Sequence, residues 1–267
     1  MLFVAVFIIA LGLLPRYSKP SFRHSLLHER LQAETVGVVT SHGEGSGVVV
    51  KRDGKVFVWT AAHVVKNVSS VEIHQRFRYN GKPAGEQVFS GHVICRLPDT
   101  DVALVWVDAP PDRLTGGHWA SSTPGPGIPV LCVGNMLGRD LDGSVSAGIV
   151  SQNGVSPTNM ESWPWKLVDQ ATVVAVPGSS GGPVFDARGD IVGIAVGWPG
   201  ISSITFFVPL RVVYSAAQQA NVTWAIYGSH APIDKVLQDA VTSAAPPPVP
   251  QDIIRLLFGF DPAEPSK

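Results

Sequence analysis

The chain has 267 residues and a formal net charge of −1; 15% of its residues are charged and 45% are hydrophobic. A near-neutral chain lacks the basic excess with which proteins neutralise phosphates, so nucleic acid is excluded as a partner. The 27 glycines and 22 prolines favour many short strands and turns over long helices.

The first 14 residues are uncharged and almost wholly apolar. As a helix this segment would be about 21 Å long, shorter than the ~30 Å hydrocarbon core of a bilayer. No basic residues precede it, whereas Arg16 and Lys19 follow it. We predict an uncleaved membrane anchor, with the rest of the chain kept on the cytoplasmic side by the positive-inside bias. A signal peptide of a secreted or periplasmic protein, an interfacial anchor and a chain truncated at its start remain alternatives.

Residues 15–34 are predicted to be a stalk, in which Leu26, Leu27 and Leu31 lie on one side of a short helix. From residue 35 onward, short apolar runs predict strands. Turn signals separate these runs at Asp53-Gly54, Asn80-Gly81, Asp142-Gly143 and Arg188-Gly189-Asp190. The predicted strands are 35–40, 47–50, 56–60, 70–74, 102–107, 130–133, 149–151, 193–196 and 204–208.

A histidine follows the third of these strands, in the segment TAAHVV at 60–65. Small residues before His63 leave room for its imidazole at a cleft. Asp101 stands at the mouth of the apolar run VALVWV, where a buried carboxylate needs a partner. Taken singly, His63 is more typical of a structural histidine at a strand end and Asp101 of a turn carboxylate, with Asp99 as a rival carboxylate.

The segment PGSSGGP at 177–183 surrounds a serine with three glycines, which are the residues most costly to order. An acyl-transfer nucleophile needs such a backbone, because its hydroxyl must be exposed and nearby N–H groups must converge on the developing oxyanion. Ser180 is the candidate nucleophile, and the N–H groups of Gly178 and Ser180 are the candidate donors. A simple β-turn is the alternative interpretation of this composition.

The blocks around His63, Asp101 and Ser180, in this order, resemble those of the chymotrypsin/trypsin-like serine proteases, and most closely the bacterial HtrA-like (Deg) branch. Four further segments carry the resemblance, which covers about residues 35–213: GSGVVV at 45–50, VLCVGN at 130–135, SAGIVS at 146–151 and GIAVG at 193–197. Two residues depart from it. Ser179 stands immediately before the candidate nucleophile, where the family has aspartate or asparagine. Thr172 stands where HtrA-like proteins tend to have aspartate. No segment of PDZ size follows the matched region.

The resemblance implies an all-β fold of two six-stranded antiparallel β-barrels, over 35–112 and 125–213, within a protease domain at 35–215. It implies a serine endopeptidase with a triad of His63 as base, Asp101 as its orienting acid and Ser180 as nucleophile, acting on polypeptide substrates. The primary specificity pocket would be lined by four residues, none of them acidic, so small or medium aliphatic side chains are favoured over Lys or Arg: Val174, Val196, Gly197 and Trp198.

Residues 216–267 are predicted to be a helical, Pro-rich tail, following a closing helix at 212–220 and including an amphipathic helix at 233–241 and a polyproline spacer at 246–250. Cys95 and Cys132 lie in apolar, strand-like surroundings and are predicted to be buried thiols, with a single disulfide as the alternative. No metal or other cofactor is expected. Two other functions stay open: a catalytically silent protease-fold protein that binds peptides, and a membrane-tethered scaffold.

Overall fold

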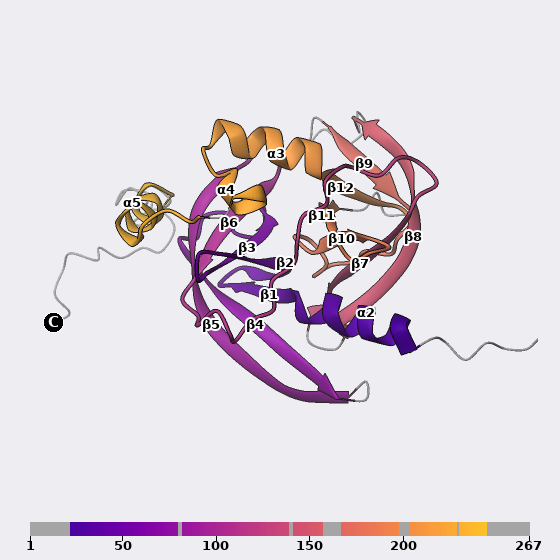
Figure 1. Ribbon diagram of the computed structural model, residues 1–267, viewed down its shortest axis with the longest axis horizontal. Coiled ribbons are helices and arrows are strands. Elements are labelled where there is room, and N and C mark those ends of the chain that lie inside the picture. The colour runs from indigo at the N-terminus through magenta and orange to yellow at the C-terminus, as the bar shows by residue number, and fades with distance from the viewer. Residues whose placement is uncertain are drawn as a thin grey trace, which may run out of the picture.

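The structure is a computed structural model that describes residues 22–79, 82–138, 141–156, 167–197, 203–228 and 230–244. Within these residues, twelve strands form two closed, six-stranded antiparallel barrels that lie side by side (Figure 1). The predicted all-β class with two barrels is therefore confirmed. The apolar segment 1–14, the spacer at 246–250 and Trp198 lie outside the described residues.

The first barrel closes between its first and fourth strands, in the order β1-β2-β3-β6-β5-β4. The β2–β3 turn is Asp53-Gly54, with both residues at positive φ (51° and 72°), as a tight type I′ hairpin requires. The strands are β1 (Thr35–Thr40), β2 (Gly43–Arg52), β3 (Lys55–Ala61), β4 (Ser70–Tyr79), β5 (Lys82–Leu97) and β6 (Val102–Val107).

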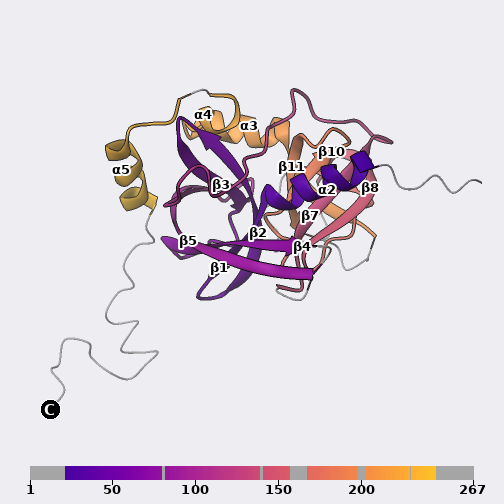
Figure 2. The same cartoon turned by 60° about the horizontal axis from the view of Figure 1, so that its bottom comes forward.

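The second barrel has the order β10-β11-β12-β9-β8-β7. Figure 2 shows four of its strands, β7, β8, β10 and β11, beside the first barrel. The segment between the barrels is tied to both of them, because Gly117 N donates to Val49 O of β2 and Ala120 N donates to Ile191 O of β11. The strands are β7 (Pro129–Met136), β8 (Leu141–Val155), β9 (Val168–Ala171), β10 (Pro183–Asp186), β11 (Ile191–Gly197) and β12 (Thr205–Pro209).

β3 shows how the two-residue period of a strand divides its side chains between two cores. Val56 and Val58 belong to the cluster inside the first barrel. Phe57 and Trp59 belong to a cluster that continues into the second barrel and the helices. The ring of Phe57 lies 4.8 Å from that of Trp224 in α4 (Trp224–Tyr227), edge to face. Because both faces of β3 are buried, its sequence is continuously apolar from Val56 to Trp59.

Two of the helices agree with the predicted ones. α3 (Leu210–Gln219) packs on β11 and β12 through Leu210, Val213, Ala216 and Ala217, whose spacing gives one apolar stripe. α5 (Asp234–Ala244) packs against β5 and buries Leu237.

Residues 22–33, within the predicted stalk, form α2 (Phe22–Ala33), a helix that packs on the barrels. Leu31 is fully buried, and Leu27, one turn earlier on the same face, packs against the same core. Leu26 lies off this face and is half exposed, contrary to the prediction. Arg30 Nη2 donates to Arg188 O and Gly189 O in the β10–β11 turn, at 2.8 and 3.0 Å.

The predicted strands all overlap observed ones, but β5, β9 and β10 were not predicted. β5 is interrupted by glycines and polar residues, and β9 and β10 have only four residues each. The turn predicted at Asp142-Gly143 is wrong, since it lies inside β8, where Gly143 at φ 62° bends the strand without ending it.

Both cysteines are free thiols, Cys95 on β5 and Cys132 on β7. Burial raises the pKa of the Cys132 thiol to about 12 and that of Cys95 to about 11. Across the described ranges, no helix combines the length and apolar character needed to cross a bilayer.

Glu34 is a buried carboxylate between α2 and β1, with 3% of its surface exposed. Its Oε1 lies 3.5 Å from Arg30 Nε, and its buried Oε2 has no hydrogen-bond partner among the described residues. Burial raises the pKa of Glu34 from 4.5 to about 7; Arg30 opposes this rise and Asp190 adds to it. The folded state therefore binds this proton more tightly than the unfolded state does.

The linkage predicts that stability is lost as pH rises from about 4.5 through about 7. Glu34→Gln removes the titration, so we expect the variant to gain up to about 3 kcal/mol on the parent between pH 5 and pH 8. Urea unfolding of both proteins at the two pH values measures this gain. A stability difference that is the same at pH 5 and pH 8 would contradict it.

Candidate active site

The fold brings His63 and Asp101 together at one end of the first barrel. Ala61, the last residue of β3, pairs with Val102, the first residue of β6, so the two side chains leave adjacent strands. His63 Nδ1 lies 2.7 Å from Asp101 Oδ2, and the backbone N of His63 donates to Asp101 Oδ1 at 2.8 Å. One buried carboxylate thus fixes both the ring and the backbone of the histidine. The rival Asp99 is exposed and lines a separate cavity beside α3.

Asp101 has a left-handed backbone conformation, with φ at 55°. Non-glycine residues adopt this conformation at a cost, and only where the surroundings hold them in it. Here Asp101 N donates to Pro98 O at 3.2 Å and Asp101 O accepts from Ala62 N at 3.1 Å. The turn therefore places a 98%-buried carboxylate under a histidine whose own side chain is 42% exposed.

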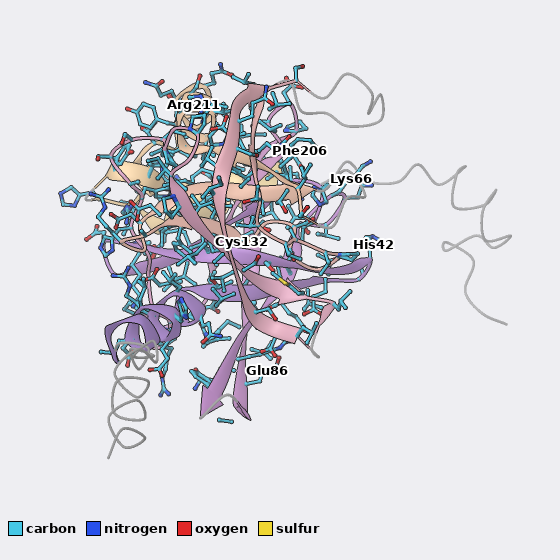
Figure 3. All side chains as sticks on the ribbon, turned by 90° about the vertical axis from the view of Figure 1, so that its right-hand side faces the viewer. His42, Lys66, Glu86, Cys132, Phe206 and Arg211 are labelled. Carbon is cyan, nitrogen blue, oxygen red and sulfur yellow. The ribbon has the colours of Figure 1, made fainter. Side chains whose placement is uncertain are left out.

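Ser180 comes from the second barrel and lies with His63 in a cavity of about 440 Å³. The β1–β2 turn supplies His42 to its wall, β2 supplies Glu44, and the segment after His63 supplies Lys66. Figure 3 shows His42 and Lys66 on the same side of the molecule. In the described part of the chain, Ser180 Oγ and His63 do not hydrogen-bond each other. Such bonds often tighten only when substrate is bound.

The segment around Ser180, residues 177–183, is called the nucleophile segment. Between residues 178 and 182, two of its backbone N–H groups have no acceptor among the residues that the structure describes. Ser179 N donates to Val176 O, Gly181 N to Ala195 O and Gly182 N to Ser179 O. Among the described residues, the N–H groups of Gly178 and Ser180 have no acceptor. These are the two groups predicted to bind an oxyanion.

Two glycines of this segment are required by both conformation and space. Gly178 has φ 94°, and a Cβ there would lie 2.1 Å from Asn135 O. Gly181 has φ 85°, and a Cβ there would lie 2.2 Å from Ser46 O. Glycine is therefore required at both positions because β7 and β2 approach the backbone closely there.

Of the predicted specificity residues, Val174 lies in the loop before Ser180, whereas Val196 and Gly197 lie on β11. Val196 is buried on β11, and Gly197 ends that strand. Val174 is 40% exposed, and its N donates to Ser146 Oγ at 2.7 Å.

The two departures from the family both serve local structure. Ser179 is buried, and its Oγ accepts from Val176 N at 3.2 Å, which closes the turn before the nucleophile. Thr172 Oγ1 accepts from Ile149 N at 3.0 Å and so ties the end of β9 to β8.

A charged cluster leads from the cavity wall into the β4–β5 hairpin, and sequence reasoning missed it. Arg76 joins Glu44 and Glu86, at 3.0 and 2.8 Å. His74 Nδ1 lies 2.7 Å from Glu86, and its Nε2 lies 3.0 Å from Glu72. The hydrogen bond with His74 holds the pKa of Glu86 below its ordinary value. Glu72, His74 and Arg76 are spaced two apart along β4, so a run of titratable residues on one face of a strand was the available signal.

Arg96 links the histidine segment to the C-terminal helix. Its guanidinium donates to the carbonyls of Val65 and Val68, which follow His63, and to that of Ala244 at the end of α5. No motif marks this residue in the sequence. A search of the described residues finds no group of three His, Cys, Asp or Glu side chains that could hold a metal ion.

The sequence profile of the family described as "Trypsin-like peptidase domain" matches residues 45–194, more than half of the chain. The chain therefore belongs to the trypsin-like peptidase family, which confirms the resemblance. Relatives include the putative serine protease HhoB of Synechocystis sp. (31% identical over 188 residues) and the serine protease Do-like HtrA of Bacillus subtilis (29% over 186). A probable periplasmic serine endoprotease, DegP-like, of Marinomonas sp. is 30% identical over 181 residues.

These matches cover 66–67% of this chain but only 35–40% of the relatives. Among solved structures, an inactive form of Rv3671c from M. tuberculosis H37Rv is similar, with a TM-score of 0.61 at 21% identity, covering 79% of this chain and 98% of the other. The HtrA-type protease AlgW with tripeptide gives a TM-score of 0.58 at 20% identity, covering 74% and 63%. Both share the fold.

We expect Gly178→Ala to abolish reactivity of the nucleophile segment, because the added Cβ collides with Asn135 O and displaces the Gly178 N–H. The rate of reaction with a serine-directed phosphonate should fall at least about 100-fold.

Gly54→Ala is the matched control. Gly54 also has positive φ (72°), but a Cβ there meets nothing within 4 Å and lies far from the cavity. The Gly54→Ala variant should lose stability from backbone strain alone and should react with the phosphonate at the rate of the parent protein. Equal rates in the parent and Gly178→Ala would contradict the expectation.

Proposed function

We propose that the protein is a serine endopeptidase that hydrolyses peptide bonds through an acyl-enzyme. The observation that carries the proposal is the convergence, on one cavity, of Ser180, a histidine held by a buried carboxylate, and two unpaired N–H groups. Membership of the trypsin-like peptidase family supports it independently.

His63 acts as the general base. Its Nδ1–H donates to Asp101, so Nε2 carries the lone pair that accepts the Ser180 proton. A serine hydroxyl is a weak nucleophile at neutral pH without such a base. Asp101 also stabilises the imidazolium that forms, since it is buried and its Oδ2 lies 2.7 Å from the ring.

The N–H groups of Gly178 and Ser180 bind the oxyanion of the tetrahedral intermediate. Each such donor contributes on the order of 3 kcal/mol in comparable sites. Ser180 Oγ forms a bond to the carbonyl carbon, the C–N bond breaks, and His63 returns the proton to the leaving amine. Water then attacks the ester by the same route, with His63 again as base, and releases the acid.

The substrates are polypeptides with small or medium aliphatic side chains before the scissile bond. Val174, Val196 and Gly197 offer no carboxylate to a Lys or Arg side chain, and an apolar pocket discriminates by about 1–3 kcal/mol per methylene. Trp198 is predicted to narrow this pocket. The periplasmic relatives favour the secreted or periplasmic alternative for location; membrane association through residues 1–14 stays a prediction.

A fluorophosphonate probe tests the proposal on the full chain. The parent should be labelled, whereas Ser180→Ala and His63→Ala should not, because the first lacks the nucleophile and the second its base. Gel fluorescence of the purified proteins gives the readout. A parent that stays unlabelled while correctly folded would sink the proposal and favour the peptide-binding or scaffold alternative.

Two carboxylate variants test the assignment of the third residue. Asp101→Asn should lower kcat for a quenched peptide by about 10⁴-fold, because the amide no longer fixes the imidazole tautomer. Asp99→Asn, two residues away and exposed, should leave kcat unchanged. The reverse outcome would transfer the role to Asp99.

A further inference from the structure

Ser46 on β2 is a serine of the first barrel that is fully buried beside the segment around Ser180 in the second barrel. Its Oγ donates to Gly178 O at 2.7 Å and accepts from Asn135 N at 2.8 Å. Its backbone N donates to Ser180 O at 2.7 Å, and its carbonyl accepts from Thr60 Oγ1 at 2.7 Å. Ser46 therefore holds the carbonyls of both residues whose N–H groups are free.

We propose that Ser46 is a positioning residue that sets the oxyanion hole, by clamping the Gly178 carbonyl with its hydroxyl and the Ser180 carbonyl with its backbone N–H. The inference rests on the proposed function, because an oxyanion hole has meaning only if Ser180 forms a tetrahedral intermediate. It assigns to the first barrel a direct part in orienting groups that belong to the second.

In a trans peptide bond, the C=O and the N–H point in opposite directions. Pro177 O accepts from Leu137 N at 2.8 Å, so the Gly178 N–H points away from Leu137. Ser179 O accepts from Gly182 N, so the Ser180 N–H likewise points away from its bonded carbonyl. The direction of each of these two N–H groups is therefore fixed by the hydrogen bond to the carbonyl of the same peptide unit.

The peptide between these two is the one that Ser46 controls. Its carbonyl, Gly178 O, accepts from Ser46 Oγ, and its N–H, on Ser179, donates to Val176 O. Gly178 has φ 94° and the freedom of a glycine, so its backbone can rotate when a neighbouring bond is lost. The hydroxyl of Ser46 is the side-chain group that fastens this residue to the first barrel.

No other group near Ser46 replaces the hydroxyl. Glycines crowd it: a Cβ at Gly134 would lie 3.2 Å from Ser46 Oγ, and one at Gly182 would lie 3.2 Å from Ser46 Cβ. Ser46→Ala therefore leaves the Gly178 carbonyl and the Asn135 N–H without partners, which favours rotation of the Gly178 backbone to regain one.

The experiment compares Ser46→Ala with Thr35→Val in the full chain. Thr35 is also buried, and its Oγ1 donates to a backbone carbonyl, Leu31 O, at 2.8 Å, but it contacts α2 and not the cavity. Both changes remove one buried hydroxyl-to-carbonyl bond. Steady-state hydrolysis of a quenched peptide, the Ki of a peptide boronic acid and the thermal midpoint are measured for each.

For Ser46→Ala we expect kcat to fall about 10- to 100-fold with KM within about threefold, because the hole acts on the transition state and little on bound substrate. The boronic acid, whose adduct places an oxygen in the hole, should lose affinity by the same factor. Thr35→Val should lose comparable thermal stability and keep the parental kcat and Ki. Ser46→Cys, which is close in shape and has a weak donor, provides a second variant if Ser46→Ala folds poorly, and its kcat should fall at least about fivefold.

A parental kcat and boronate affinity in Ser46→Ala would overturn the inference, as would an equal loss of kcat in Thr35→Val. Both results leave the proposed function intact, because the parent still turns over. A folded parent that neither cleaves peptides nor reacts with the fluorophosphonate probe overturns both together, and the parent measurement is therefore made first.

Discussion

The hydrogen bonds between β2 and the nucleophile segment are the contact on which the rest of the site depends. His63 and Asp101 belong to the first barrel and Ser180 to the second, so each barrel alone holds an incomplete set of groups. Ser46 N to Ser180 O and Ser46 Oγ to Gly178 O join the two sets directly. Rigid barrels position such groups well, because their strands have no free edges to rearrange. A shift of about 1 Å between the barrels would disturb the nucleophile and its donors together.

The three candidate site residues followed from local signals, because each is marked by a few neighbouring residues, and the two-barrel fold followed from the family resemblance that these segments carry. A strand that ends in small residues before His63, a carboxylate opening a buried strand and a glycine-framed serine need no knowledge of distant contacts. The same locality explains the errors. β5 and β10 are strands because neighbouring strands pair with them, and their own sequences carry glycines or only four residues. The sequence around Gly143 predicts a turn, although β8 pairs with β7 on both sides of this residue and so continues as a strand.

Ser46, Arg96 and the cluster around His74 could not be predicted for a related reason. Each acts through contacts between residues far apart in the chain: Ser46 is 132 residues from Gly178, and Arg96 is 148 from Ala244. A serine between glycines in a strand looks like a gap in the apolar pattern. Its contacts become visible only when the second barrel brings the Gly178 carbonyl to its hydroxyl. Likewise, α2 looks like a spacer in sequence because its burial depends on a β10–β11 turn more than 150 residues later.

The placement of the two thiols offers a way to observe the barrels separately. Cys95 lies in the first barrel and Cys132 in the second, and both have pKa values far above neutrality because of burial. A fully buried thiol such as Cys132 reacts with an alkylating or disulfide reagent only when its surroundings open, and the thiolate is the reacting form. Its modification rate, divided by the rate for an unprotected cysteine, gives the free energy of local opening around β7. The half-buried Cys95 reports on β5 in the same way with a smaller protection. The natural sequence thus carries one internal probe of local opening per barrel.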